Sequence, residues 1–190
     1  MIENESYRTA PSERTQGLVF YAPQPEDGRR VYEAVRTWGG LDLNSPYAYL
    51  LACDRFAEQS CVAELNGELV GFLVGLASPQ APDTLFVWQV GVSPTLRGQR
   101  LGRRLIAAVL GRAPQRFAFV EAHVGPNNQS SMRLFEGVAR QYDTRFESRD
   151  DYPASWFPSG HDAEQLVRVG PLGAGCADPV GTGAAPNHQE

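Results

Sequence analysis

The stretch VGVSPTLRGQRLGRRLI, residues 90–106, decides the fold. It begins as an apolar run, passes through a turn that holds Pro94 and Gly98, and continues with the spacing of a helix. The first N–H groups of a helix have no partner inside the helix, and the helix dipole favours negative charge there. A glycine-bearing turn between a strand and a helix therefore predicts an anion-binding site at the start of that helix.

The composition excludes several classes of protein. The 190 residues suffice for one domain with a proper core. The net charge of −5 does not favour a nucleic-acid partner, and because all 17 basic residues are arginine, lysine chemistry is excluded. Cys53, Cys61 and Cys176 lack metal-like spacing, so we expect neither a disulfide framework nor a metal site. With no secretory leader pattern and no membrane-spanning apolar run, we expect a cytoplasmic protein without a membrane partner.

The two ends of the chain differ in composition from its middle. Residues 1–15 are polar, and residues 171–190 are rich in glycine, alanine and proline. Such segments bury too little apolar surface to offset the entropy of ordering them. We therefore expect a flexible N-terminus over 1–15, a folded domain over 16–170 and a disordered tail over 171–190.

Inside 16–170 the hydrophobic period alternates between that of strands and that of helices. Asn66-Gly67 predicts a hairpin, and Ser45 before Pro46 predicts a helix start. Strands are expected at 17–23, on both sides of the hairpin within 60–78, at 83–92 and 116–124, and near 141–147 and 163–169; helices are expected at 26–38, 45–59, from 101 and at 127–140. This order indicates an α+β fold rather than a doubly wound sheet.

The run from Arg97 to Gly102 matches the pattern [Q/R]-x-x-G-x-[G/A] at its first and last positions. In its strand-to-helix context it resembles the acetyl-CoA signature of the GCN5-related N-acetyltransferase (GNAT) superfamily, and the element order over 17–170 resembles that fold. The resemblance implies a central mixed, mostly antiparallel sheet flanked by helices (α/β/α), with acetyl-CoA as co-substrate and no metal. Arg100 replaces the middle glycine, and a left-handed arginine costs about 1–2 kcal/mol. The backbone there is therefore either helix-like or strained, and we expect the helix-like conformation.

The same resemblance implies which residues bind the cofactor. Asn128 and Ser131 fit the N-x-x-[A/S] segment of the second cofactor helix. Phe135 stands where many relatives place the tyrosine that protonates the departing thiolate, so the acid stays unassigned, with solvent or Tyr142 as alternatives. The implied cofactor-binding residues are Val90, Val92, Arg97, Gly98, Gln99, Arg100, Leu101, Gly102, Arg103, Asn128 and Ser131.

Three longer segments, 41–64, 82–92 and 160–169, resemble the L-2,4-diaminobutyrate acetyltransferases of ectoine synthesis. That resemblance implies transfer of an acetyl group from acetyl-CoA to the γ-amine of L-2,4-diaminobutyrate by a homodimer in the bacterial cytoplasm. It also implies that the segment GHDAE, 160–164, carries substrate ligands that reach the neighbouring subunit.

A diamino acid requires carboxylates for its ammonium groups, a donor for its carboxylate and an apolar wall. Asp42, Asn44 and Tyr47 supply polar groups next to a predicted helix start, and the alternative for Asp42 is a loop or capping residue. His161 and Glu164 are candidate substrate ligands and candidate general bases, and the alternative for both is a solvated strand edge.

The resemblance implies that Trp88 forms the apolar wall beside the acetyl group. Period-two alternation places it on one strand face with Phe86 and Val90, and places Gln89 on the opposite face. The alternative is a tryptophan that only packs in the core.

Two other functions stay open at this point. One is a GNAT enzyme that acetylates a different small amine, because the cofactor turn would be the same and only the acceptor pocket would change. The other is a non-catalytic regulatory module that binds acetyl-CoA, which Phe135 and Arg100 keep open.

Overall fold

The computed structural model describes residues 17–173. The expected flexible N-terminus, 1–15, lies outside the described residues, as does most of the expected tail, 171–190. The first residues after position 170 are tied to the domain: the N–H of Leu172 donates to the carbonyl of Ala118 at 2.7 Å, and the Thr144 hydroxyl donates to the carbonyl of Pro171 at 2.8 Å.

A seven-stranded sheet forms the centre of the described chain, in the order β1-β2-β3-β4-β5-β7-β6. Every neighbouring pair is antiparallel except β4 and β5, which are parallel. The strands are β1 (Leu18–Tyr21), β2 (Cys61–Leu65), β3 (Glu68–Ser78), β4 (Ala81–Val92), β5 (Phe119–Val124), β6 (Arg145–Tyr152) and β7 (Glu164–Gly170). The mixed, mostly antiparallel sheet expected from the resemblance is confirmed.

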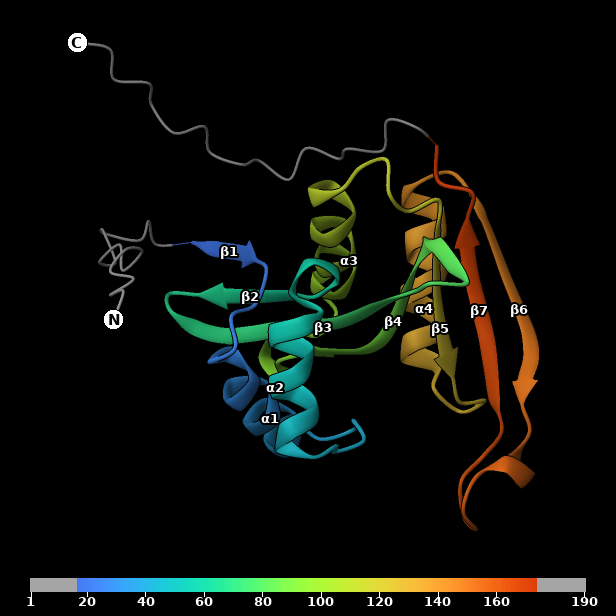
Figure 1. The fold of residues 1–190 in the computed structure, drawn as a ribbon, viewed down its shortest axis with the longest axis horizontal. Helices are drawn as coiled ribbons and strands as arrows, with labels where there is room; N and C mark the ends of the chain where they lie inside the picture. The colour runs from blue at the N-terminus through green and yellow to red at the C-terminus, as the bar shows by residue number, and fades with distance from the viewer. Residues whose placement is uncertain (1–16, 174–190) are drawn as a thin grey trace, which may run out of the picture.

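Helices cover both faces of this sheet (Figure 1). They are α1 (Asp27–Trp38), α2 (Pro46–Arg55), α3 (Leu101–Arg112) and α4 (Gln129–Gln141), with single 3-10 turns η1 (Ala57–Gln59), η2 (Pro94–Leu96) and η3 (Ala154–Trp156). The helices α1 and α2 pack against the middle strands on one face, whereas α3 and α4 pack on the other, α4 against β7 and β6.

Local sequence signals explain most element boundaries. The Ser45 side chain caps α2 by accepting a hydrogen bond from the N–H of Ala48, as predicted. The hairpin predicted at Asn66-Gly67 is confirmed: it joins β2 to β3, and both residues have positive φ. The strand expected near 141–147 is displaced, because α4 continues to Gln141 and β6 spans Arg145–Tyr152.

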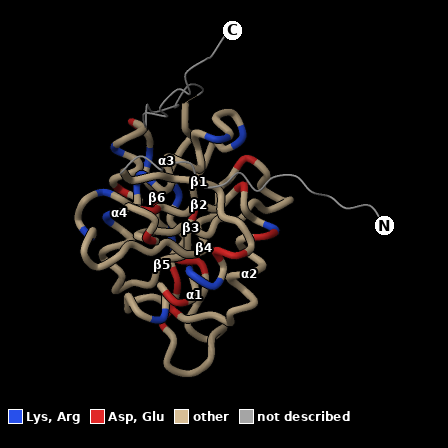
Figure 2. The backbone as a smooth tube through the Cα atoms, turned by 90° about the vertical axis from the view of Figure 1, so that its left-hand side faces the viewer, with Lys and Arg blue, Asp and Glu red and all other residues tan. Residues whose placement is uncertain are grey.

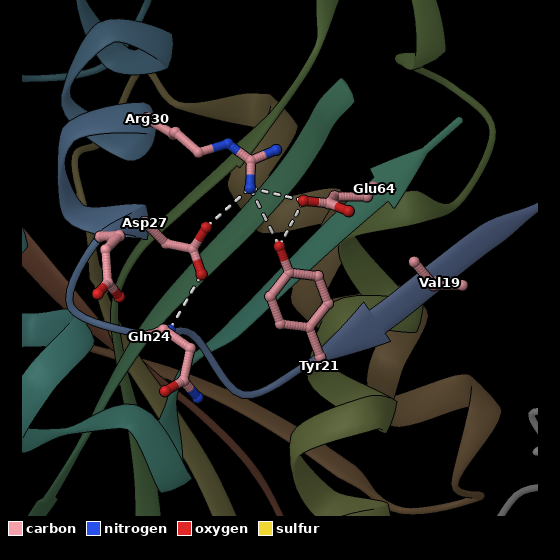
Figure 3. Close-up of a pocket in the computed structure, with 7 residues that line it drawn as sticks. Val19, Tyr21, Gln24, Asp27, Arg30 and Glu64 are labelled. Carbon is pink, nitrogen blue, oxygen red and sulfur yellow. Dashed lines mark hydrogen bonds and ion pairs between the residues drawn. The ribbon is translucent and has the colours of Figure 1, made fainter. Parts of the chain in front are cut away.

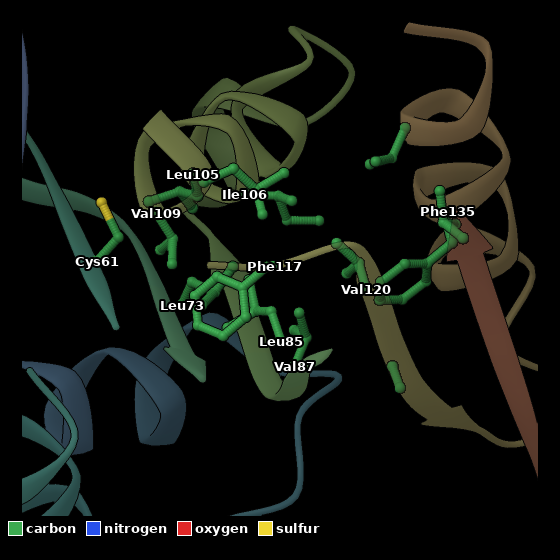
Figure 4. Packing of buried hydrophobic residues seen from close by; sticks show 14 of the residues in the cluster. Cys61, Leu73, Leu85, Val87, Leu105, Ile106, Val109, Phe117, Val120 and Phe135 are labelled. Carbon is green, nitrogen blue, oxygen red and sulfur yellow. The ribbon is translucent and has the colours of Figure 1, made fainter. Parts of the chain in front are cut away.

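The core has two separate clusters, one on each side of the sheet. In Figure 4, Phe135 of α4 and Leu105 of α3 point toward strand residues that include Leu85 and Val120. The second cluster joins Val31 of α1 and Tyr49 of α2 to residues of β2 and β3. Because β3 and β4 are held from both faces, the middle of the sheet is the rigid platform for the site.

Charged residues of both signs are interspersed along the backbone in Figure 2. Some form pairs one turn apart on helix surfaces, such as Arg36 with Glu33 and Arg140 with Glu136. Within residues 17–173, no helix combines the length and the apolar character needed to span a bilayer.

Candidate active site

The site begins where β4 and β5 separate. Their parallel pairing covers only three residue pairs, Thr84↔Phe119, Leu85↔Val120 and Phe86↔Glu121. Beyond Phe86, β4 continues against β3 alone, while β5 continues against β7. This divergence opens the sheet between two strands and leaves main-chain groups of β4 available to a ligand.

A cleft of about 450 Å³ occupies this opening, a size that suits a small-molecule site. One wall is β4, and the other is formed by β5, the start of α4 and the ends of β6 and β7. The lining residues are Gly40, Leu41, Asp42, Phe86, Val87, Trp88, Gln89, Val90, Ala122, His123, Val124, Gly125, Asn128, Ser131, Phe135, Tyr152, Phe157 and Glu164. Six of the predicted site residues, from both the cofactor and the substrate groups, therefore meet in one cleft.

A β-bulge shapes the β4 wall. Val74 pairs with Gln89 and Gly75 pairs with Val87, so Trp88 has no partner across the ladder. The extra residue breaks the expected alternation. The predicted faces are therefore wrong in part. The ring of Trp88 lies 6.3 Å from that of Tyr49, and Gln89, which was expected on the opposite face, accepts a hydrogen bond from the Tyr49 hydroxyl at 3.0 Å. Val90, which was expected on the same face as Trp88, packs with the core under α3 and α4.

Asp42 reaches the cleft on a loop that is fixed by its main chain. Its carbonyl accepts hydrogen bonds from Gln89 Nε2 at 2.8 Å and from the Tyr49 hydroxyl at 3.4 Å. The side chain of Asn44 donates to the same carbonyl at 3.4 Å. Asp42 is exposed, so its carboxylate stays available to a ligand at the cleft rim.

Asn44 and Tyr47 lie outside the residues that line the cleft. The Tyr47 side chain is 68% exposed on the first turn of α2. Asn44 instead supports the loop, because its N–H also donates to the Tyr49 hydroxyl at 3.3 Å. The structure of this one chain thus brings Asp42 into the cleft, but not its two predicted polar neighbours.

The cofactor turn lies between β4 and α3. Gly98 has φ +79°, and Arg100, the N-cap residue of α3, has φ 63° and ψ 14°, in the left-handed region. The helix-like backbone expected at Arg100 is therefore wrong. The turn needs a left-handed residue at the glycine position of the motif, and Arg100 adopts that conformation at a cost of about 1–2 kcal/mol. No side chain of the described residues caps α3, so its first N–H groups remain available to an anion.

The arginines of the turn also hold the fold together. Arg97 donates from Nη2 to the carbonyl of Trp38 at 3.0 Å and from Nε to that of Val92 at 3.3 Å. Arg103 donates to the carbonyl of Gly137 on α4 at 3.3 Å. Burial, with added repulsion from Arg100 and Arg140, lowers the pKa of Arg103. A phosphate placed here would therefore meet concentrated positive charge.

Two other positions of this turn serve local packing. Gln99 donates from Nε2 to the carbonyl of Thr95 at 3.4 Å. A Cβ at Gly102 would lie 3.1 Å from Leu134 Cδ1, so this glycine permits the close approach of α3 and α4. Leu101 is buried in the core, so any contact it makes with a cofactor comes from its main chain.

The start of α4 faces the same cleft. The side chain of Asn128 caps α4 by accepting hydrogen bonds from the Ser131 N–H at 3.0 Å and from the Ser130 hydroxyl at 2.9 Å. Phe135 lines the cleft and offers no proton. Tyr142, the alternative acid, lies at the far end of α4, roughly 20 Å along the helix axis from Asn128 at about 1.5 Å per residue. Geometry thus argues against Tyr142 as the acid.

Glu164 and His161 are neighbours with different exposure to the cleft. Glu164 opens β7, lines the cleft and has a side chain that is 21% exposed. His161 Nε2 lies 3.9 Å from Glu164 Oε1, but His161 is not among the lining residues. Its Nδ1 is 2.7 Å from the carbonyl of Asp162, and its ring stacks on Phe157 at 4.0 Å.

His123, Tyr152 and Phe157 line the cleft without having been predicted. His123 Nε2 lies 2.7 Å from Asp151 Oδ2 on the edge strand β6, which β7 separates from β5 in the sheet. One signal for it was present in the sequence, because the alternation in 119–124 places His123 opposite the buried face of its strand. No pattern in the sequence indicated its partner, since β5 and β6 are separated by a helix along the chain.

A second cavity, of about 530 Å³, is lined by residues of β1, β2 and the start of α1 (Figure 3). Arg30 of α1 pairs with Asp27 at 2.8 Å and with Glu64 at 2.5 Å, and the Tyr21 hydroxyl donates to Glu64 at 2.5 Å. Burial and this hydrogen bond raise the pKa of Tyr21 well above its usual range. Since these buried polar groups satisfy one another, the cluster ties β1, α1 and β2 together.

The splayed sheet and the turn before α3 define the class of protein. The profile of the acetyltransferase (GNAT) family matches residues 28–138, the region from α1 into α4. Ard1 from Thermoplasma volcanium shares this fold with a TM-score of 0.63 at 19% identity, over 80% of this chain and 97% of that one.

Closer relatives define the family within that class. An L-2,4-diaminobutyric acid acetyltransferase from Virgibacillus pantothenticus is 43% identical over 154 residues, covering 79% of this chain and 96% of the relative. Another from Nocardia farcinica is 39% identical, covering 85% of this chain and 84% of the relative. A diaminobutyrate acetyltransferase from Paenibacillus lautus, solved with its substrate L-2,4-diaminobutyric acid and coenzyme A, superposes with a TM-score of 0.78 at 37% identity, over 83% of this chain and 97% of that one. The chain belongs to the L-2,4-diaminobutyric acid acetyltransferases of the GNAT family.

Proposed function

We propose that this protein transfers the acetyl group of acetyl-CoA to the 4-amino group of L-2,4-diaminobutyrate, giving N4-acetyl-L-2,4-diaminobutyrate and CoA for ectoine synthesis. The observation that carries the proposal is the cleft between β4 and β5, which brings two carboxylates, those of Asp42 and Glu164, together with the β4 strand that leads into the turn before α3. The Paenibacillus lautus enzyme, which shares this fold, was solved with that diamino acid and coenzyme A.

The cofactor binds along β4 and the start of α3 in this proposal. The open N–H groups at the start of α3, from Leu101 on, receive the pyrophosphate, with Gly98 and the arginines of the turn around it. Main-chain groups of Val90 and Val92 pair with the pantetheine arm, since β5 has diverged from them. Asn128 and Ser131 border the same arm at the start of α4.

The substrate is held by its amino-acid end. Asp42 and Glu164 lie on opposite walls of the cleft and supply two carboxylates. A carboxylate next to the α-ammonium keeps that group protonated, so it orients the substrate and also prevents acetylation at the α-position. Trp88, which is 38% exposed, forms the wall beside the reacting carbon. His161 supports Glu164 from outside the cleft.

The chemistry needs a neutral amine and a stabilised oxyanion. An alkyl ammonium has a pKa of about 10 and must lose a proton before its nitrogen attacks the thioester carbon. Positioning the amine against the thioester contributes several kcal/mol. In this proposal a main-chain N–H of β4 near Val90 donates to the tetrahedral oxyanion. The C–S bond then breaks, and CoA leaves as a thiolate that is protonated from solvent or from the reacting nitrogen.

The homodimer and the cytoplasmic location implied by the resemblance belong to this proposal. Trp156, which is 72% exposed in η3, lies 5.8 Å from Tyr152 at the end of β6, next to the cleft. Tyr152 is also exposed, so the two rings form an apolar patch next to the cleft, which suits a subunit contact. Multi-angle light scattering of the purified protein should give twice the mass of the 190-residue chain, and a monomer would contradict this part of the proposal.

One assay separates this function from the two alternatives. CoA release is measured with L-2,4-diaminobutyrate, ornithine, lysine and a polyamine as acceptors. The proposal expects the highest kcat/KM for L-2,4-diaminobutyrate. Faster turnover of another amine would indicate a different acceptor, and no turnover with any amine would indicate a binding module.

A further inference from the structure

His123 is an ionisable group of the cleft that the proposed function leaves without a role. It lies on β5, lines the cleft and has a side chain that is 17% exposed. Its ring packs edge-on against Phe86 at 5.3 Å and over Tyr152 at 4.1 Å. Residues of β4 and β6 therefore fix the orientation of this imidazole, which β5 carries.

Asp151 is positioned toward His123 by a second β-bulge. Asp150 pairs with Gln165 and Tyr152 pairs with Glu164, so Asp151 is the extra residue of β6. A bulge redirects the side chain of its extra residue, and bulges are frequent beside active sites. Asp151 Oδ2 lies 2.7 Å from His123 Nε2.

This contact selects one tautomer of the imidazole. A carboxylate only accepts, so Nε2 carries the hydrogen and donates it to Asp151. The Nδ1 atom then holds a lone pair, and it has no hydrogen-bond partner among residues 17–173. A carboxylate on the far nitrogen orients the ring and stabilises the imidazolium that forms when the near nitrogen accepts a proton.

We propose that His123, oriented by Asp151, accepts the proton that the acceptor amine must lose, an inference that rests on the acetyl transfer proposed above. The substrate ammonium gives one proton to Nδ1, and its nitrogen forms the new C–N bond. The C–S bond breaks, and a second proton from that nitrogen ends on the CoA sulfur, directly or through water. His123 returns its proton to solvent, so the reaction yields amide, CoA thiol and one H⁺.

The surroundings of His123 distinguish it from the other candidate bases. Glu164 faces the same cleft, where a carboxylate is suited to hold the α-ammonium, and His161 does not line the cleft. The other charged or titratable groups that face His123 lie on its own strand and on β6 and β7. On β6, Asp151 and Tyr152 contact the ring, and Arg149 is separated from it by Leu166 of β7. Beside it, Glu121 of β5 forms an ion pair with Arg168 of β7.

The test is the pH dependence of His123→Gln, with His161→Gln as the matched control. A neutral imidazole is required in the wild type, so kcat/KM should fall along an acidic limb of its pH profile. The His123→Gln variant should lose about 10²-fold or more in kcat at pH 7 with a small change in KM. Its rate should recover as pH rises toward the titration of the substrate ammonium. The His161→Gln variant should keep the acidic limb.

Asp151→Asn supplies the second variant. Removing the negative charge makes the imidazolium less stable, so the acidic limb should move to lower pH, and the altered tautomer should lower kcat. Binding of CoA, measured by calorimetry, should stay within about twofold for all three variants. A His123→Gln enzyme that keeps the acidic limb, or that loses activity equally at every pH, would overturn the proposal. If the wild type fails to acetylate L-2,4-diaminobutyrate, the function itself is wrong, and that outcome is seen before any variant is made.

Discussion

The hydroxyl of Tyr49 donates a hydrogen bond to Oε1 of Gln89 at 3.0 Å, and so joins α2 to the β4 wall of the cleft. Tyr49 is fully buried, and its hydroxyl also donates to the carbonyl of Asp42 at 3.4 Å. Gln89 in turn donates from Nε2 to that same carbonyl at 2.8 Å. This triangle holds the Asp42 loop against the bulged strand, so the position of the Asp42 carboxylate depends on a hydroxyl outside the lining of the cleft.

Replacing Tyr49 by phenylalanine should loosen that loop. The change removes one buried hydroxyl and leaves its partners less satisfied, which should cost about 1 kcal/mol of folding free energy. The KM for L-2,4-diaminobutyrate should rise severalfold, while the KM for acetyl-CoA should change little. Tyr32→Phe is the control, because the Tyr32 ring neighbours Tyr49 at 6.2 Å but lies outside the triangle. An unchanged diaminobutyrate KM in Tyr49→Phe would show that the triangle does not position the site.

Arg100→Gly should stabilise the fold. The left-handed backbone at φ 63° costs arginine about 1–2 kcal/mol of folding free energy, and glycine removes that strain. Glycine also makes the unfolded chain more flexible, which costs about 0.5–1 kcal/mol of stability. The net gain should be up to about 1 kcal/mol, measured by urea unfolding. Arg104→Gly in the interior of α3 should instead destabilise by about 1 kcal/mol. Equal losses in both variants would contradict the strain at Arg100.

Gly102→Asp should weaken acetyl-CoA binding. The new carboxylate places negative charge beside the expected pyrophosphate, and its Cβ would lie 3.1 Å from Leu134 Cδ1. We expect a loss of about 2 kcal/mol, roughly 30-fold in Kd by isothermal titration calorimetry. Gly111→Asp, at the other end of α3 with open space around it, should leave Kd unchanged. If a folded Gly102→Asp variant bound acetyl-CoA with wild-type affinity, the start of α3 would not be part of the cofactor site.

The two cleft carboxylates should each matter for the acceptor. Asp42→Asn and Glu164→Gln should each lower kcat/KM for L-2,4-diaminobutyrate by tenfold or more, about 1.4 kcal/mol each. Asp54→Asn, at an exposed position near the end of α2, serves as the control. Steady-state kinetics at saturating acetyl-CoA measures the effect. Retention of wild-type kinetics in both variants would show that other groups hold the diamino acid.

The two buried thiols should be inert in the native protein. Burial raises the pKa of Cys61 to about 11 and that of Cys53 to about 12. Little thiolate is then present at pH 8, so in a Cys176→Ser background Ellman's reagent should react only after unfolding. The raised pKa values also make the free energy of unfolding depend on pH. The stability gained by keeping these thiols protonated is fully present below the pKa of an unfolded cysteine, and it is lost as pH rises through the pKa values of the folded protein. Rapid native labelling at pH 8 would contradict this burial.

Local signals explain why much of the fold was predictable. The turn before α3 is encoded within a few consecutive residues, as are the Asn66-Gly67 hairpin and the Ser45 cap, so no distant contact is needed to recognise them. The conformation of Arg100 was mispredicted because propensity argues against a left-handed arginine, whereas the geometry of the strand-to-helix turn requires one.

Tertiary features account for the rest. The bulges at Trp88 and Asp151 are properties of strand register, which the alternation of a single strand does not encode. For that reason the face of Gln89 was mispredicted, and the pairing of His123 with Asp151 was missed. The exposure of Tyr47 likewise follows from the direction in which α2 leaves its loop.

The position of acetylation tests the central claim most directly. The wild-type enzyme is incubated with acetyl-CoA and L-2,4-diaminobutyrate, and two-dimensional NMR of the product identifies the acylated nitrogen. A cleft that binds the α-ammonium between Asp42 and Glu164 keeps that group protonated and presents the other amine to the thioester. The account predicts N4-acetyl-L-2,4-diaminobutyrate almost free of the N2 isomer, and a predominantly N2-acetylated product would contradict it.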